Sequence, residues 1–254
     1  MEITVLGSGT YEPDPKRHMA GYLLKASDKN IIFDFGWGAM ENMIRAGVNY
    51  FDVDAIFLTH LHPDHCSDLL SFIHIAQTEA VTNRMNHDLT IYGPRGMNKT
   101  MEQVLLAFNM ARRMPKFKLS FKELKDNDTV WIGKAMVRCH GVKHNVPDSL
   151  AYRVECEGKS IAYSGDTADC DGLRTACKGA DLAIIEASWP EELNTPGHMT
   201  SKDAGRIAKE CFVRKLVLTH VAPKYLQEYD VIGDASEQYN GPIVLAEDLM
   251  KIKV

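Results

Sequence analysis

Residues 59–65 read Thr59-His60-Leu61-His62-Pro63-Asp64-His65 and directly follow the apolar run Ala55-Ile56-Phe57-Leu58. Three imidazoles and one carboxylate therefore fall within six residues, and these ligand types suit zinc or a similar divalent metal. The apolar run has the length and composition of a buried strand, so the ligands stand where that strand should end. We therefore expect a metal site at this strand end.

The spacing of these ligands predicts two neighbouring coordination sites. Side chains alternate faces in an extended segment, so His60, His62 and Asp64 would share one side while His65 would face away. A turn at Pro63 would bring Asp64 and His65 together, so that His60 with His62 serves one metal and Asp64 with His65 serves another. The alternative is a polar surface turn that happens to be rich in histidine. It is disfavoured because such turns use glycine, asparagine or serine.

The composition is that of a soluble globular protein. Of 254 residues, 45% are hydrophobic and 25% are charged, and the net charge of -5 gives no general attraction to nucleic acid. No run reaches the apolar length of a membrane helix and the start shows no basic leader, so we expect no membrane partner and no signal peptide. The six cysteines form no CxxC pair, which favours reduced thiols and a cytoplasmic location.

Apolar periodicity divides the chain into strands and helices. Expected strands cover residues 2–6, 21–25, 30–35, 55–58, 89–92, 130–132, 135–139, 150–156, 160–163, 182–186 and 216–219. Expected helices cover residues 39–46, a segment capped by Ser67 that runs through Ala80, and residues 101–108, 171–178 and 201–212. No linker separates two halves, so we expect one domain over residues 1–254 with an α/β fold.

The HxHxDH pattern of residues 60–65 resembles the metallo-β-lactamase fold superfamily of binuclear hydrolases. The resemblance implies a four-layer αββα sandwich with further ligands at later strand ends. His144, Asp166 and His220 stand in such places. His144 is preferred to His140, because His140 interrupts a strand. Asp34, at the end of an earlier strand, is expected to orient a ligating histidine, with a helix cap as the alternative.

By this resemblance two divalent ions share seven protein ligands. His60, His62 and His144 hold one ion, Asp64, His65 and His220 hold the other, and Asp166 bridges them. Zinc is the favoured metal, with manganese or iron as alternatives. Asp64 is also expected to orient or deprotonate a bridging water. A purely structural metal protein is disfavoured, because structural zinc sites are closed by four protein ligands each.

A second constellation resembles the ribonuclease Z branch of this superfamily. Glu186 ends an expected strand, and Gly197-His198-Met199-Thr200 leads an expected helix. The resemblance makes His198 a catalytic residue that stabilises the attacked phosphate or protonates its leaving oxygen, with Glu186 as the residue that orients it and keeps it protonated. In the alternative interpretation His198 leads the helix and has no chemical task.

The expected activity is hydrolysis of a small or cyclic phosphodiester by a metal-bridging hydroxide. Ribonuclease Z enzymes that trim transfer RNA carry an inserted arm, and 254 residues leave no room for it. The alternatives are a ribonuclease Z-type endonuclease acting at RNA 3′ ends, and a metal-dependent lactonase, thioesterase or sulfatase. RNA is thus a partner that we consider but do not favour, and a homodimer is left open.

Two basic segments are candidates for contact with an anionic substrate. One is the loop from Tyr11 to His18, for which a solvated turn is the alternative. The other is a strip of cations interleaved with phenylalanine, for which a solvated face is favoured. Its cations are Arg112, Arg113, Lys116, Lys118, Lys122 and Lys125. Binding of nucleic acid through this strip is a third hypothesis for the function.

Overall fold

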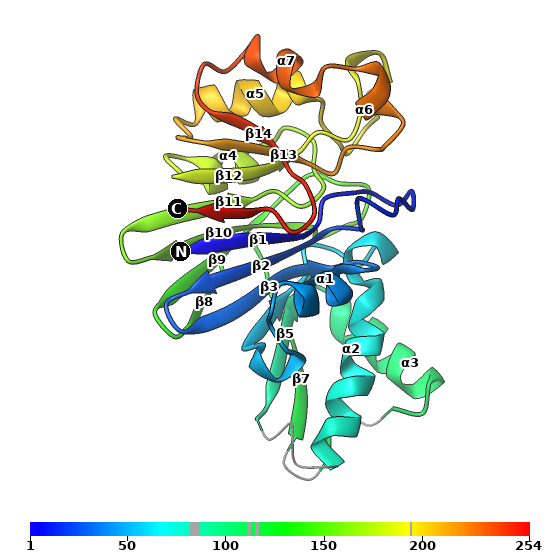
Figure 1. The fold of residues 1–254 in the computed structure, drawn as a ribbon. Helices are drawn as coiled ribbons and strands as arrows, with labels where there is room; N and C mark the ends of the chain where they lie inside the picture. The colour runs from blue at the N-terminus through cyan, green and yellow to red at the C-terminus, as the bar shows by residue number, and fades with distance from the viewer. Residues whose placement is uncertain (82–86, 111–112, 115–116, 194) are drawn as a thin grey trace.

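The computed structural model describes residues 1–81, 87–110, 113–114, 117–193 and 195–254, whose strands form two sheets (Figure 1). The first sheet has the strand order β15-β1-β2-β3-β4-β5-β7-β6 and the second has the order β14-β13-β12-β11-β10-β9-β8. The first contains β1 (Glu2–Gly7), β2 (Gly21–Ala26), β3 (Lys29–Phe35), β4 (Ala55–Phe57), β5 (Leu89–Gly93), β6 (Arg113–Met114), β7 (Phe117–Glu123) and β15 (Lys251–Lys253). The second contains β8 (Thr129–Ile132), β9 (Ala135–Gly141), β10 (Leu150–Cys156), β11 (Lys159–Tyr163), β12 (Leu182–Glu186), β13 (Leu216–Thr219) and β14 (Ile243–Leu245).

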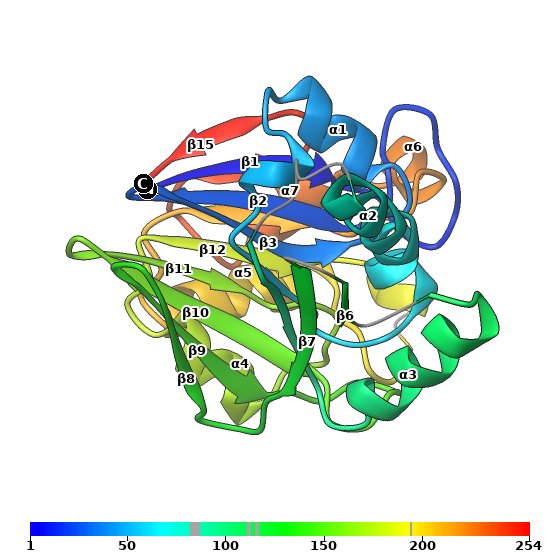
Figure 2. The ribbon, with the colours of Figure 1, turned by 90° about the horizontal axis from the view of Figure 1, so that it is seen from below.

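The helices divide between the outer faces of the two sheets (Figures 1 and 2). Helices α1 (Ala39–Arg45), α2 (Pro63–Val81) and α3 (Met97–Ala107) accompany the first sheet, and α4 (Asp171–Cys177), α5 (Ser201–Glu210), α6 (Tyr225–Glu228) and α7 (Val231–Ser236) accompany the second. Short 3-10 turns lie at η1 (Tyr50–Asp52) and η2 (Glu191–Leu193). No helix within the described part of the chain is both long and apolar enough to span a membrane.

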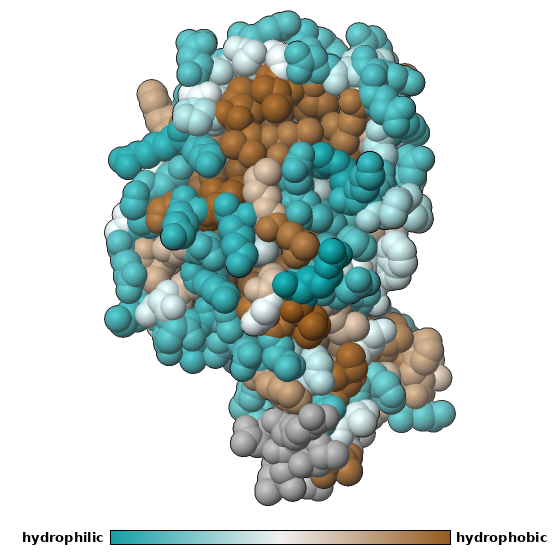
Figure 3. Space-filling model, in the orientation of Figure 1, coloured by the Kyte–Doolittle hydropathy of each residue, from teal (hydrophilic) through white to brown (hydrophobic). Residues whose placement is uncertain are grey.

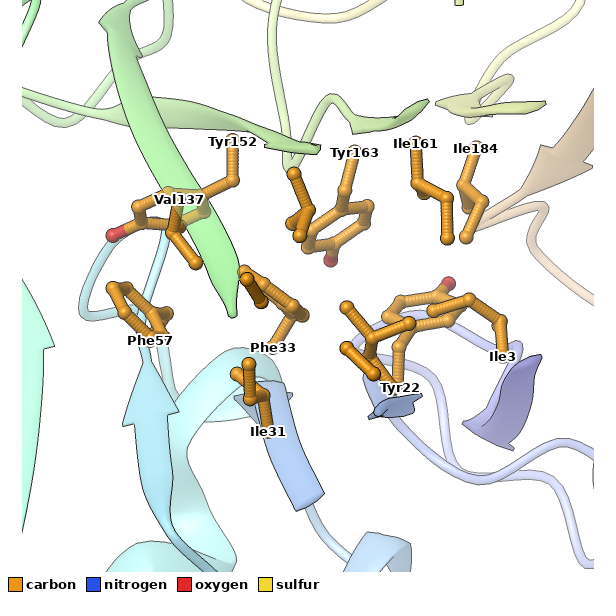
Figure 4. Packing of buried hydrophobic residues seen from close by; sticks show 14 of the residues in the cluster. Ile3, Tyr22, Ile31, Phe33, Phe57, Val137, Tyr152, Ile161, Tyr163 and Ile184 are labelled. Carbon is orange, nitrogen blue, oxygen red and sulfur yellow. The ribbon is translucent and has the colours of Figure 1, made fainter. Parts of the chain in front are cut away.

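Three buried apolar clusters separate four layers and confirm the predicted αββα sandwich. One lies between the two sheets, where Phe33 of β3 packs against Tyr152 of β10 with ring centroids 5.5 Å apart (Figure 4). A second joins the first sheet to its helices, as in the contact of Phe35 with Phe72 of α2. The third joins the second sheet to α4, α5 and α7. The central strands are buried nearly continuously, and because successive side chains point to opposite faces, both faces of each sheet carry apolar side chains.

Parallel pairing brings the predicted motifs to a common edge. Strands β3, β4 and β5 are parallel in the first sheet, and β11, β12 and β13 are parallel in the second. Carboxyl ends of parallel strands meet at one edge of a sheet, so the loops that follow β3, β4, β11, β12 and β13 lie near one another. These loops carry most of the residues singled out from the sequence.

The two chain ends lie side by side because β15 pairs with β1 in antiparallel register, with Ile252 opposite Ile3 (Figure 1). The other sheet ends at β14, whose residues are all half-buried. Figure 3 shows hydrophobic atoms over this part of the molecule and a largely hydrophilic rim around it. Neither β14 nor β15 was expected from the sequence, because both are three-residue strands that depend on a partner distant in the chain.

Helix α2 begins at Pro63, four residues before the predicted start at Ser67. Proline suits the first turn of a helix, because its fixed φ is already helical and its missing N–H is not needed there. Asp64 and His65 therefore project from the first turn of α2, and the His65 N–H donates to the His62 carbonyl at 3.0 Å. The expected turn at Pro63 is thus the start of the helix itself.

The basic strip is partly a strand that the sequence analysis did not predict. Residues 117–123 form β7, in which Leu119 and Phe121 are buried while Lys118 and Lys122 are exposed. The alternation of lysine with apolar residues is the period-2 pattern of a half-buried strand. Arg112 and Lys116 lie outside the described residues, as does the side chain of Arg113. The described lysines of the strip agree with the solvated face that was favoured.

Candidate metal centre

Four predicted ligands from three loops converge on a first cluster. His60 and His62 follow β4, His144 follows β9 and Asp166 follows β11. One donor atom from each lies within 4.8 Å of the others. His62 Nδ1 is 3.1 Å from His60 Nε2 and 3.3 Å from His144 Nε2, and His60 Nε2 is 3.8 Å from Asp166 Oδ2.

Asp166 belongs to a second cluster as well. Donor atoms of Asp64, His65, Asp166 and His220 also lie within 4.8 Å of one another. Nε2 of His220 is 3.3 Å from both His65 Nε2 and Asp64 Oδ2. Asp166 Oδ1 is 3.2 Å from His65 Nε2 and 3.6 Å from His220 Nε2. Asp166 therefore presents one oxygen to each cluster.

The spacing of these donors fits two divalent cations. Ligand atoms 2.0–2.1 Å from a tetrahedral zinc ion lie about 3.3 Å from one another, which is the spacing of the closest pairs in both clusters. Asp166 Oδ1 is buried and accepts no hydrogen bond within the described residues. A buried carboxylate oxygen without a donor is costly unless a cation meets it. The donor set therefore fits a metal pair that shares Asp166.

Asp34 fixes the orientation of His65 and, through Thr59, of His60. His65 Nδ1 donates to Asp34 Oδ2 at 2.7 Å, which leaves the Nε2 lone pair facing the second cluster. Thr59 Oγ1 donates to the same carboxylate at 2.8 Å, so it accepts from His60 Nδ1 at 3.0 Å. Tyr163 Oη donates a further hydrogen bond to Asp34 at 2.6 Å. Asp34 thus lies where the sequence predicted a residue that orients ligating histidines.

His144 and His220 are oriented in the same way. His144 Nδ1 donates to the Gly197 carbonyl at 2.9 Å, and its Nε2 faces the first cluster. Ser188 Oγ donates to Glu186 and therefore accepts from His220 Nδ1 at 2.9 Å. His60, His65, His144 and His220 thus all direct Nε2 to the centre, whereas His62 directs Nδ1. Such outer hydrogen bonds are a general feature of metal-ligating histidine.

Glu186 and His198 also meet as the sequence predicted. His198 Nδ1 lies 3.1 Å from Glu186 Oε1 and 4.0 Å from Asp166 Oδ2. Glu186 is 0% exposed and accepts the Thr167 N–H at 2.7 Å, which ties the loop of Asp166 to that of His198. Glu186 therefore connects His198, the Asp166 loop and, through Ser188, His220.

Burial and neighbouring charges set the protonation of these groups. Burial lowers the pKa of His60 well below 6.5, which favours the neutral ring that a metal requires. Burial opposes the carboxylate form of Asp166, but the nearby His220 and His65 hold its pKa well below the usual range. Burial alone would lower the pKa of His198, but the hydrogen bond and charge of Glu186 raise it to about 9. His198 is therefore protonated at neutral pH.

A cavity of about 310 Å³ opens beside both clusters. His62, Asp64, Asp166, His198 and His220 line it, so a substrate in this cavity reaches both metal positions and the protonated imidazole. Its remaining lining residues are Thr10, Tyr11, Pro63, Ser188, Trp189 and Ala222. A second cavity, of about 460 Å³, contains Lys125 of the basic strip but none of the predicted metal ligands or catalytic residues. It is lined by Arg95, Glu123, Leu124, Lys125, Asp126, Asp128, Gly141, Asp148 and Leu150.

Two other histidines and the basic residues of the Tyr11 to His18 loop are not part of the donor clusters. His140 is buried in β9, and His18 binds Asp248 at 2.7 Å, which agrees with their exclusion from the ligand set. Arg17 donates to the Ala246 carbonyl at 2.7 Å. Two of the three basic residues of the loop are thus used in holding it to the C-terminal segment, and only Lys16 is exposed.

Several residues of the site were not singled out from the sequence. Thr59, Tyr163 and Ser188 orient the histidines, and Tyr11 and Trp189 line the cavity. Thr59 and Ser188 immediately adjoin predicted motifs, and that position was the available signal. Tyr163 had none, because only the packing of the two sheets places its hydroxyl against Asp34.

A family model for the beta-lactamase superfamily domain matches residues 12–221. Ribonuclease Z of Myxococcus xanthus strain DK1622 is 27% identical over 303 residues, covering 98% of this chain and 96% of the relative. Because that alignment is longer than the 254 residues of this chain, the relative contains residues without a counterpart here.

Two solved structures share the fold over nearly the whole chain. The metallo-beta-lactamase fold protein YhfI from Bacillus subtilis has a TM-score of 0.85 and 22% identity, and covers 99% of this chain and 98% of its own. A diphosphatase from the PhnP family has a TM-score of 0.78 and 19% identity, covering 100% and 97%. These two structures show the metallo-β-lactamase fold, and the family match over residues 12–221 shows that the chain belongs to the β-lactamase superfamily, with curated relatives in its ribonuclease Z-like branch.

Proposed function

We propose that the protein is a metal-dependent phosphodiesterase that hydrolyses a small or cyclic phosphodiester. The observation that carries the proposal is the pair of donor clusters joined by Asp166 and open to one cavity that also contains His198. Seven donor residues serve two ions, one fewer than the eight that would close both as structural zinc sites, so substrate and water have room to bind. The protein is thus an ester-bond hydrolase.

His60, His62 and His144 would hold one divalent ion, and Asp64, His65 and His220 the other, with Asp166 shared. Such a pair of ions polarises an ester oxygen and lowers the pKa of water. Zinc is proposed because five of the seven donors are imidazoles, which suit zinc better than manganese. Imidazole also suits iron, which is the alternative that elemental analysis would distinguish.

The chain's own residues supply the proton transfers and the orientation. Asp64 lines the cavity beside the second cluster, where its carboxylate would orient the attacking water or accept its proton. His198, protonated and held by Glu186, would donate a proton to the leaving oxygen or a hydrogen bond to the attacked phosphate. Glu186 acts through His198 and is therefore a positioning residue.

Two other activities remain as alternatives. The likeness to ribonuclease Z favours cleavage at RNA 3′ ends, but the additional residues of that relative have no counterpart in this chain. A lactonase, thioesterase or sulfatase would use the same metals but would not need a protonated group with a pKa as high as that of His198.

Six free cysteines agree with a cytoplasmic location. Light scattering would test whether the protein forms a homodimer.

The test is a comparison of ester classes with zinc-loaded protein. We expect hydrolysis of bis(p-nitrophenyl) phosphate to exceed that of p-nitrophenyl acetate and of a thioester, and to be lost in Asp64→Ala. His198→Ala should impair the phosphodiester reaction more than any carboxylic ester reaction. Phosphodiesterase activity that persists without metal, or faster cleavage of precursor transfer RNA than of small diesters, would contradict the proposal.

A further inference from the structure

Five residues that line the site cavity are neither metal ligands nor partners of those ligands, and none of them is charged. They are Thr10, Tyr11, Pro63, Trp189 and Ala222, and the set of lining residues includes neither lysine nor arginine. Two of these residues are aromatic, and Tyr11 is 55% exposed, so its ring is available to a ligand. This part of the cavity is suited to an uncharged, flat group rather than to a second phosphate.

Trp189 lies next to the proposed proton donor. Its ring centroid is 6.4 Å from that of His198. The backbone N–H of Trp189 donates to the carbonyl of Met199, the residue after His198. The indole Nε1 is buried and has no hydrogen-bond partner within the described residues. The ring is therefore not held in place by a hydrogen bond from its own nitrogen.

Contacts from helix α6 brace the indole instead. The Tyr225 ring centroid is 5.6 Å from the Trp189 centroid, and the Lys224 ammonium is 6.0 Å from it. Neither residue is among those that line the cavity, whereas the indole itself does line it. The loop of Tyr11 lies at the same end of the molecule as α6 (Figures 1 and 2). A braced ring with a free face is a preorganised surface for stacking.

We propose that Trp189, together with Tyr11, binds a planar ring carried by the leaving group of the substrate. This inference rests on the proposed function, in which His198 faces the leaving oxygen. A group attached to that oxygen extends past His198, and Trp189 is the neighbour that it meets. The substrate is therefore a phosphoester with a nucleobase or an aryl ring next to the scissile phosphate.

Stacking of a base on an aromatic side chain contributes enough affinity to be measured, about tenfold or more. Binding calorimetry of the zinc-loaded protein with two matched ligand pairs tests whether Trp189 binds such a ring. The first pair is adenosine 5′-monophosphate and ribose 5-phosphate, which differ only in the base. The second is phenyl phosphate and methyl phosphate. We expect the ring-bearing member of at least one pair to bind about tenfold more tightly, and that pair identifies the kind of ring.

The variants Trp189→Leu, Trp189→Phe and Trp131→Leu make the test specific. The ratio of affinities should fall to about one in Trp189→Leu and persist in Trp189→Phe. It should also persist in Trp131→Leu, because Trp131 lies on β8 and does not line the cavity. Equal affinities in both pairs, or a ratio that survives in Trp189→Leu, would overturn the inference.

Turnover of bis(p-nitrophenyl) phosphate by the same preparation separates this inference from the proposed function. Turnover without ring preference would remove the role of Trp189 and leave the phosphodiesterase. Ring preference without phosphodiester turnover would remove the phosphodiesterase and show Trp189 binding rings in a site with another activity.

Discussion

His65 Nδ1 donates a hydrogen bond to Asp34 Oδ2 over 2.7 Å, between two side chains that are both fully buried. Asp34 is the penultimate residue of β3 and has a φ of +53°, and His65 lies in the first turn of α2. The same carboxylate accepts hydrogen bonds from Thr59 and Tyr163. One aspartate in the left-handed region thus sets the direction of two ligating histidines, one directly and one through Thr59.

Asp34→Asn should weaken metal binding by about 10- to 100-fold, the usual effect of losing an outer partner of a ligating histidine. Asparagine tolerates a positive φ, so the backbone is expected to keep its conformation. Competition with a zinc-binding dye would measure the affinity. Asp54→Asn is the matched control, because Asp54 pairs with Lys29 away from the clusters. Equal zinc affinity in both variants would show that Asp34 does not orient the ligands.

Glu186→Gln should move the alkaline limit of activity to lower pH. His198 must be protonated to act as an acid, and Glu186 raises its pKa from 6.5 to about 9, so activity falls as pH rises through that value. Loss of the carboxylate charge lowers the pKa of His198, so the fall begins at lower pH. The measurement is the pH profile of kcat/KM.

Ser188→Ala serves as the control for the pH profile. It removes the link between Glu186 and His220 but leaves the contact of Glu186 with His198. We expect it to lower kcat/KM without displacing the alkaline limit. An unchanged profile in Glu186→Gln would be inconsistent with His198 as the acid.

Zinc removal should lower the thermal stability of the protein. Buried imidazoles and carboxylates converge without a cation between them, whereas an ion at 100 times its Kd adds about 2.7 kcal/mol to the free energy of unfolding. Calorimetric scans with zinc and with a chelator would show the difference in Tm. Asp166→Ala, which removes the shared ligand, should show a much smaller difference. If the Tm of the unmodified protein were the same with zinc and with the chelator, the clusters would not bind zinc in the folded protein.

Tyr152→Phe should destabilise the metal-free protein by about 1–3 kcal/mol, the cost of leaving a buried acceptor unsatisfied. The buried Tyr152 hydroxyl donates to the Leu58 carbonyl at 2.6 Å, just before the first motif residue Thr59. Urea unfolding would measure the loss. Tyr50→Phe is the comparison, since Tyr50 is only half-buried. Similar unfolding free energies for the two variants would argue against this role of Tyr152.

Much of the centre was predictable because its signals are local. HxHxDH at a strand end and single polar residues after later strands indicated which side chains would meet, and the structure brings them together. His144 lies in the first cluster, whereas His140 is buried in β9 opposite Ala151 of β10 and belongs to neither cluster. The expected α/β sandwich followed from the resemblance rather than from the periodicity.

What was missed depends on contacts between distant segments. The start of α2 at Pro63 was hidden because a proline beside ligands resembles a turn as much as a helix start. Strands β14 and β15 exist through pairing with β13 and β1, which no local pattern reveals. Tyr163 and Trp189 contribute to the site only through the folding of the second sheet and the loop after β12 onto the ligands.

Metal stoichiometry tests the central claim most directly. Elemental analysis of purified, zinc-replete protein should give two ions per chain. The double variant His60→Ala with His62→Ala removes two donors of the first cluster only and should retain one ion. One ion or none in the unmodified chain, or two ions in the double variant, would contradict a pair of cations held by separate clusters that share Asp166.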